Sequence, residues 1–240
     1  MPNVSPTHIV KSYEEDLKRL REMIARMGGL AERQVADAAD ALVRRDTNLA
    51  AEVVQRDKLL DDMERDVEQF CVRLLALRQP MAQDLRLIIA CMKISQDLER
   101  IGDYARNGAK RAIVVSQQPL MGSLNGFERM AELVQENLRG AIDALVENDA
   151  VKADEVWGND EPIDGIYNGI FREMLTFMME DPRNITAAAH LLFIAKNMER
   201  IGDHATNIAE RVHFAVLGSP LTEERPKADV SSSAVVNPPA

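Results

Sequence analysis

The chain has 240 residues, of which 46% are hydrophobic and only 4% aromatic, a composition that is typical of helical bundles and predicts almost no strand. A formal net charge of −10 disfavours nucleic acid or an anionic membrane surface as the main partner, because both are themselves negative. The longest weakly polar run, residues 185–195, is too short to cross a bilayer, which takes about 20 residues.

Apolar residues at helical spacing predict three long helices in the first half of the chain. The first covers about residues 13–45. The second begins after Asp46, a residue type that caps helices, and ends at Pro80, because the residue before a proline avoids the helical conformation. The third helix covers about residues 81–115.

The same pattern recurs in the second half, where residues 40–61 align with residues 143–164. Helices are expected over residues 126–148, 150–180 and 182–217, with Pro162 kinking the middle one and Gly218 ending the last. The chain therefore divides into a first three-helix bundle (1–118), a turn-rich linker (119–125), a second three-helix bundle (126–218) and a polar, proline-rich tail expected to be disordered (219–240).

The cysteines and the N-terminus bear on the compartment. Cys71 and Cys91 show no CxxC spacing, so we expect buried free thiols rather than a disulfide or a zinc site. Residues 1–16 contain no apolar segment of the kind that a secretory signal needs. Both observations favour a cytoplasmic protein.

One decapeptide occurs twice: LERIGDYARN at 98–107 returns as MERIGDHATN at 198–207, with seven of ten positions identical. Residues four apart share a helix face, so two oxygen-rich stripes are expected. They consist of Glu99, Asp103 and Asn107, and of Glu199, Asp203 and Asn207. Glycine inside a helix costs roughly 1 kcal/mol relative to alanine. Gly102 and Gly202 therefore indicate either a close approach of another helix or access of a ligand to the backbone.

The turn at Pro80 makes its two flanking helices antiparallel, so residues equally far from the turn lie level. The predicted acidic pairs are Asp57 with Asp103 and Asp61 with Glu99 in the first half, and Asp160 with Asp203 and Asp164 with Glu199 in the second. Carboxylates this close repel one another unless cations, protons or arginines compensate. Arg100 and Arg200 are the candidate supporting side chains, since each lies three residues before a motif aspartate.

Oxygen ligands without cysteine favour Mg²⁺, Mn²⁺, Ca²⁺ or iron over structural zinc. A redox di-iron bundle would carry Glu-x-x-His on two helices, whereas here glycine follows each motif glutamate at that spacing. His204 has Tyr104 as its counterpart, so we interpret it as a local histidine rather than a shared ligand. No phosphate-binding loop or catalytic triad is evident. It remains open whether the stripes face each other or are separate solvated helix faces.

In these residues the chain resembles the PhoU-type phosphate-transport regulators, whose tandem units carry an acidic ExxxD signature within an ERIGD helix. The resemblance covers about residues 13–218 and includes RQPMAQDLR at 78–86 and AKNMERIGDHATNIAE at 195–210. It implies an all-α fold of two tandem three-helix bundles related by pseudo-two-fold symmetry. It also implies that Glu99, Asp103, Glu199 and Asp203 bind metal, whereas Asp57, Asp61, Asp160 and Asp164 are added from the level argument alone.

The resemblance further implies a cytoplasmic, non-enzymatic and often dimeric regulator. Such a regulator links the phosphate ABC transporter, through its ATPase PstB, to the sensor histidine kinase PhoR, and damps uptake and the starvation response when phosphate is plentiful. Two alternatives stay open from the residues alone. One is a metal-dependent hydrolase or ferroxidase that uses the same carboxylates, and the other is a structural repeat whose acids are ordinary surface charge.

Overall fold

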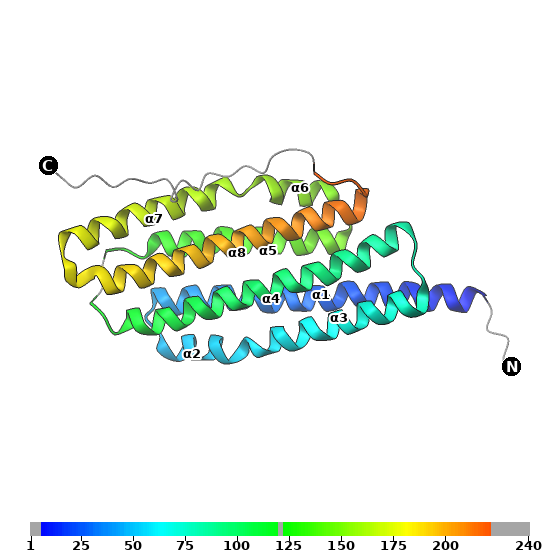
Figure 1. Cartoon of the computed structure of the whole chain (residues 1–240), viewed down its shortest axis with the longest axis horizontal. Coiled ribbons are helices and arrows are strands. Elements are labelled where there is room, and N and C mark those ends of the chain that lie inside the picture. Colours follow the sequence, from blue (N-terminus) through cyan, green and yellow to red (C-terminus); the bar gives the residue numbers. More distant parts are fainter. Residues whose placement is uncertain (1–5, 120–121, 222–240) are drawn as a thin grey trace.

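Long helices lie side by side along the molecule in the computed structural model, which describes residues 6–119 and 122–221 (Figure 1). The first half contains α1 (Pro6–Val43), α2 (Thr47–Arg56), α3 (Lys58–Arg78) and α4 (Ala82–Ser116). The second half contains α5 (Asn125–Glu147), α6 (Ala150–Gly158), α7 (Glu161–Glu180), a 3₁₀ turn (Pro182–Asn184) and α8 (Ile185–Leu217). Since α2 and α3 follow one another along one rod, as do α6 and α7, each half is a bundle of three rods, as predicted (Figure 1).

The expectation of one unbroken helix before Pro80 was wrong, because the rod is interrupted at Asp57. The second half is interrupted at the equivalent place, Asn159 and Asp160. In both, a tight turn follows the aspartate: the Leu60 N–H donates to the Asp57 carbonyl over 2.9 Å, and the Ile163 N–H donates to the Asp160 carbonyl over 3.0 Å. Both aspartates are 3% exposed, so a buried acid marks each interruption.

The kink expected from Pro162 lies close to this interruption but has another origin. Pro162 sits in the first turn of α7, where its missing N–H costs nothing. The first half breaks at the same place without a proline. What the two interruptions share is therefore the buried aspartate and not the proline.

Helix ends follow local sequence signals. The Asp46 carboxylate accepts hydrogen bonds from the Asn48 and Leu49 N–H groups at 2.9 and 3.0 Å, as its predicted capping role requires. Gly218 ends α8 with a φ of 78°, also as predicted. The first helix begins at Pro6, earlier than expected. The expected disordered tail falls largely on residues 222–240, which lie outside the described residues.

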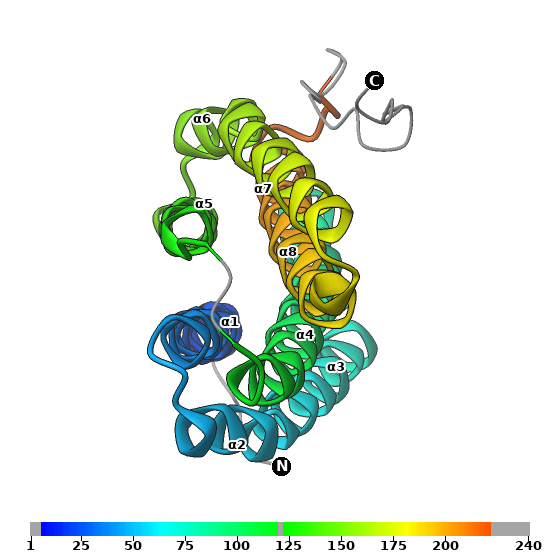
Figure 2. The same ribbon diagram turned by 90° about the vertical axis from the view of Figure 1, so that its left-hand side faces the viewer.

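The two halves share one core, and two of the three pairs of equivalent rods meet (Figure 2). Helices α4 and α8 pack against each other in the middle, α1 packs against α5, and the broken rods lie at the two outer ends. Gly28 makes the α1–α5 contact close, because a Cβ there would lie 2.7 Å from the Ile142 side chain. Cys71 and Cys91 are buried and free, which confirms the prediction. No helix within residues 6–119 and 122–221 combines the length and apolar character needed to cross a membrane.

Candidate functional site

The two motif glycines allow the outer rods to approach the central helices. A Cβ on Gly102 would overlap Leu60 of α3 and lie 3.3 Å from an Asp57 carboxylate oxygen. A Cβ on Gly202 would lie 3.0 Å from Ile163 of α7 and 3.8 Å from an Asp160 oxygen. Of the two explanations left open by the sequence, close helix approach is therefore the one that these contacts support. The approach also places each buried aspartate directly against the motif.

Asp57 and Asp103, which the sequence placed level, share one arginine. Arg106 donates to the Asp57 carboxylate and lies 2.7 Å from Asp103 Oδ1. Gln34 Nε2 of α1 donates to Asp57 Oδ1 from the other side at 3.4 Å. Burial raises the pKa of Asp57, against the opposing effect of Arg106, and Asp103 and Asp61 raise it further. The first acidic pair is thus bridged by a cation from the protein itself.

Sequence reasoning missed Arg106, although it follows Asp103 at the i,i+3 spacing of helical ion pairs. Its counterpart in the repeat is Thr206, so the two copies of the motif differ at this position. The Thr206 hydroxyl lies 3.5 Å from Asp160 Oδ1. A neutral hydroxyl in the second half therefore stands where the first half has a guanidinium.

The second predicted pair, Asp61 and Glu99, lines a common cavity. Burial raises the pKa of Glu99, and the Asp103 carboxylate raises it further. Arg100 lowers this pKa, whereas Asp61 and Glu64 add smaller increases. Arg100 lies 3.6 Å from both Glu99 and Asp103, so it is placed as the sequence proposed. The acids of the first half therefore face one another between α3 and α4 and do not form two separate solvent-exposed helix faces.

The acids of the second half are more deeply buried. Asp160 and Asp164 are each 3% exposed, Glu199 is 7% exposed, and Asp203 is half-buried. Lys196 Nζ lies 2.8 Å from Glu199 Oε1. The Arg200 guanidinium extends towards the first half, 5.6 Å from the centre of the Tyr104 ring. The remaining motif residues, Asn107 and Asn207, are half-buried on α4 and α8.

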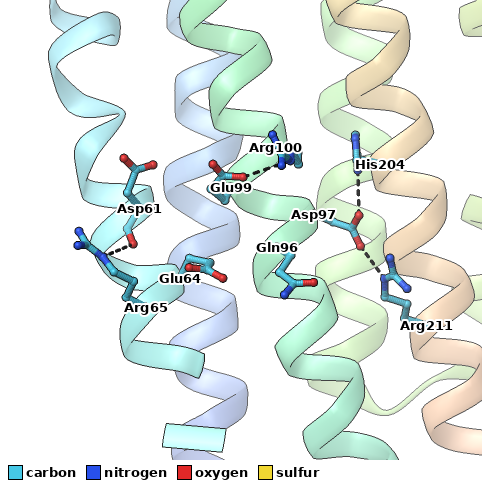
Figure 3. Close-up of a pocket in the computed structure, with 9 residues that line it drawn as sticks. All are labelled: Asp61, Glu64, Arg65, Gln96, Asp97, Glu99, Arg100, His204 and Arg211. Carbon is cyan, nitrogen blue, oxygen red and sulfur yellow. Dashed lines mark hydrogen bonds and ion pairs between the residues drawn. The ribbon is translucent and has the colours of Figure 1, made fainter. Parts of the chain in front are cut away.

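A cavity of about 660 Å³ opens between α3, α4 and α8 beside Asp61 and Glu99 of the first half (Figure 3). Its lining comprises Asp61, Glu64, Arg65, Gln96, Asp97, Glu99, Arg100, His204 and Arg211. One wall, from α3 and α4, is rich in carboxylates. The other wall contains two basic groups from α8, so the cavity joins residues of both halves.

Asp97 connects those walls. It is 5% exposed, its Oδ1 lies 2.9 Å from His204 Nδ1, and its Oδ2 accepts from Arg211 Nε over 2.6 Å. Sequence reasoning missed Asp97 because its counterpart is Asn197 and the repeat therefore gave no signal. His204, interpreted from the sequence as a local histidine, bonds across the two halves.

Carboxylate oxygens are suitable ligands for a hard cation, but the carboxylates described here do not converge on one position. Among the residues that the structure describes, no three His, Cys, Asp or Glu side chains converge closely enough to hold a metal ion. In the first half, the Arg106 guanidinium contacts both Asp57 and Asp103. A metal ion bound by that pair would have to displace this arginine.

Comparison with known proteins finds one family over nearly the whole chain. Residues 24–112 and 127–212 each match the family described as the PhoU domain. A Caulobacter vibrioides protein named phosphate-specific transport system accessory protein PhoU homolog is 53% identical over 226 residues, which cover 94% of this chain and 98% of that protein. A Rhizobium meliloti protein of the same name is 47% identical and covers 96% of this chain and 98% of its own length.

Two solved structures are similar over most of the chain. The crystal structure of PhoU from Pseudomonas aeruginosa matches with a TM-score of 0.82 at 41% identity, covering 86% of this chain and all of that one. The crystal structure of the phosphate transport system regulatory protein PhoU from Streptococcus pneumoniae matches with a TM-score of 0.82 at 27% identity, covering 88% of this chain and all of that one.

Proposed function

Because this chain belongs to the PhoU family, we propose that it is a negative regulator of phosphate uptake and of the phosphate-starvation response. The observation that carries the proposal is the match over nearly the full length of relatives named as accessory proteins of the phosphate-specific transport system. The same names favour a regulator over an enzyme. In this proposal the protein acts in the cytoplasm by binding other proteins.

The partners that we propose are the transporter ATPase PstB and the sensor histidine kinase PhoR, with the regulator itself a homodimer. Their support is the family resemblance, since partners of this kind are expected of a PhoU-type protein. The central pairing of α4 with α8 supports an adaptor, because it joins two similar bundles through a shared core and leaves both outer rods at the edges of the molecule.

The test is deletion of the gene from its own bacterium, grown in high phosphate. We expect phosphate uptake and starvation-gene expression to rise several-fold and to return to the repressed level when the wild-type gene is restored. Unchanged expression in the deletion strain would refute the regulatory function. Quantitative transcript measurement and uptake of labelled phosphate provide the two readouts.

We also propose that the acidic pairs bind Mg²⁺, Mn²⁺ or iron. Glu99 and Asp103, with Asp57 and Asp61, would hold the ion in the first half, and Glu199 and Asp203, with Asp160 and Asp164, would hold it in the second. Burial, and after it the neighbouring Asp103 carboxylate, raises the pKa of Glu99, and a bound cation would offset both effects, which supports this assignment. The ion would supply positive charge that links the outer rod to the central helix.

Elemental mass spectrometry on tag-free protein tests the metal proposal. The comparison protein carries Glu99→Gln, Asp103→Asn, Glu199→Gln and Asp203→Asn, and circular dichroism checks that it is folded. We expect stoichiometric metal in the wild type and none in the variant. Absence of metal from both proteins would end the proposal and leave the acids as a docking surface for basic partners.

A further inference from the structure

A groove between α1 and α3 is positively charged, although the protein as a whole is acidic. Its volume is about 410 Å³, and its walls include Arg19, Met23 and Arg26 from α1 and Asp66, Phe70 and Arg73 from α3. Three arginines and one aspartate give these walls a positive balance, whereas the chain carries a formal charge of −10. The groove lies on the first half only, and none of its lining residues also lines the acidic cavity.

The arginines of this groove keep their hydrogen-bonding capacity. Within the described ranges, neither Arg26 nor Arg73 forms an ion pair, whereas other arginines such as Arg56 and Arg78 do. The Arg19 guanidinium stacks on Phe70, with 5.0 Å between its carbon and the ring centre. Stacking of this kind leaves the N–H groups at the edge of the guanidinium free to donate to another group.

The repeat indicates that the fold does not require this groove. At the 103-residue shift that aligns the two halves, Arg73 corresponds to Thr176. Arg26 corresponds to Arg129, whose guanidinium pairs with Glu132 at 2.8 Å. The second half therefore builds the same bundle with one of these arginines absent and another neutralised. The bundle architecture therefore does not account for the unpaired arginines of the first half.

We propose that the groove between α1 and α3 docks a carboxylate-rich segment of a partner protein. A guanidinium matches a carboxylate in geometry and bonds it through two N–H groups, so three available arginines favour a segment with several acidic side chains. Phe70 and Met23 add apolar surface between them. Leu77, which is 67% exposed, lies one helical turn beyond Arg73 on the same face and extends that apolar surface.

The occupant is a protein segment because the groove combines charge with apolar contact. A small inorganic anion would use the arginines but leave Phe70, Met23 and Leu77 without a function. The inference deepens the proposed function and rests on it, since the partner is taken to be a protein that the regulator engages. Charge complementarity also predicts that docking weakens as salt is added.

Fluorescence anisotropy with a labelled peptide of glutamates around a central leucine tests the groove directly. The full chain is compared with a triple variant, Arg19→Gln, Arg26→Gln and Arg73→Gln. A control variant removes the same charge from the second half through Arg129→Gln, Arg172→Gln and Arg183→Gln. We expect the wild type and the control to bind and the groove variant to show a Kd about tenfold higher or more.

Three outcomes would overturn the inference. They are no binding of the peptide by the wild type, equal binding by the groove variant, and equal losses in both variants. Phosphatidylglycerol vesicles provide a further arm: loss of vesicle binding in the groove variant, with peptide binding unchanged, would assign the groove to lipid instead. Circular dichroism and thermal melting confirm that the variants are folded, as expected for exposed positions.

Complementation of the deletion strain separates this inference from the proposed function. Failure of the wild-type gene to restore repression would refute the regulatory function, and the peptide measurement would then decide the groove alone. If the wild type and the control restore repression but the groove variant does not, docking through the groove is supported. Full restoration by the groove variant overturns the docking role while leaving the regulatory function intact.

Discussion

Gly102 and Gly108 lie on the same helix, α4, in different surroundings. A Cβ at Gly102 would overlap Leu60, whereas nothing lies within 4 Å of a Cβ at Gly108. We therefore expect Gly102→Ala to lower the free energy of unfolding by about 1–3 kcal/mol through overpacking. Gly108→Ala, the matched control, should raise it by about 0.5–1 kcal/mol because alanine favours the helix. Urea denaturation followed by circular dichroism measures both, and equal stability of the two variants would contradict the close contact.

Glu99 gives a pH-dependent prediction. Burial and neighbouring carboxylates raise its pKa in the folded protein, so ionised Glu99 lowers stability at pH values above the raised pKa. This cost disappears as the pH falls below the ordinary glutamate pKa of about 4.5. In metal-free buffer, Glu99→Gln should therefore stabilise the fold by up to about 1 kcal/mol at pH 7. At pH 4 it should have almost no effect.

Thermal melting at both pH values, with chelator present, checks this expectation. Glu155→Gln, at an exposed position on α6, serves as the control and should leave the melting temperature unchanged at either pH. A loss of stability in Glu99→Gln at pH 7 would mean that Arg100 outweighs the repulsion from the surrounding acids.

At the scale of elements, the short helices α2 and α6 depend on matching caps. Asp46 accepts from the Asn48 and Leu49 N–H groups, and Asp149 accepts from the Val151 and Lys152 N–H groups. Asp46→Ala should cost about 1 kcal/mol of stability, and Asp46→Asn should retain most of it because asparagine also caps helices. Chemical denaturation of the two variants measures the difference. If alanine and asparagine were equivalent, the cap would have no energetic role.

Much of the helical arrangement followed from sequence. Apolar spacing predicted the rods, and the turn at Pro80 predicted that Asp57 and Asp103 lie at the same height on neighbouring helices. The interruption at Asp57 could not be predicted, because no glycine or proline marks it in the sequence. The backbone of Asp57 itself keeps helical angles, with φ of −52° and ψ of −38°. The interruption depends on the burial of Asp57 beneath Gly102, a tertiary contact between different rods.

The candidate site was likewise predictable only in part. The level of Asp57 and Asp103 followed from helix geometry, but the guanidinium between them did not, since spacing does not tell which acid an arginine will reach. Arg106 has acids on two different helices within range. The role of Asp97 could not be predicted from the sequence, because it depends on which faces of α4 and α8 meet. The periodicity of a single helix contains no such information.

At the scale of the whole molecule, Asp97 joins the two halves at a buried position. Replacing it by asparagine leaves Arg211 without a carboxylate partner, so Asp97→Asn should destabilise the protein by about 1–3 kcal/mol. A double-mutant cycle with Arg211→Gln isolates the interaction between them. We expect a coupling free energy of about 1 kcal/mol or more from urea denaturation. Additive effects of the two substitutions would show that this ion pair contributes nothing to holding the halves together.

The contacts between the halves also follow a symmetric pattern. Tyr104 and His204 occupy the same position in the two copies of the motif, and their rings lie 5.6 Å apart. Equivalent helices likewise meet, α1 with α5 and α4 with α8. Contacts of a position with its own counterpart are those of a symmetric pair of identical subunits. The two halves are therefore arranged as the subunits of a symmetric homodimer would be, although they belong to one chain.

Because both units lie in one chain, the two sides of this interface need not be identical. On one side Asp97 now binds Arg211, whereas on the other side the equivalent positions are Asn197 and Arg111. Arg111 has turned instead to the Phe193 ring, 4.1 Å from its centre. A symmetric dimer would have to carry either both charged links or neither, so a single charged link is possible only because the two units are not identical.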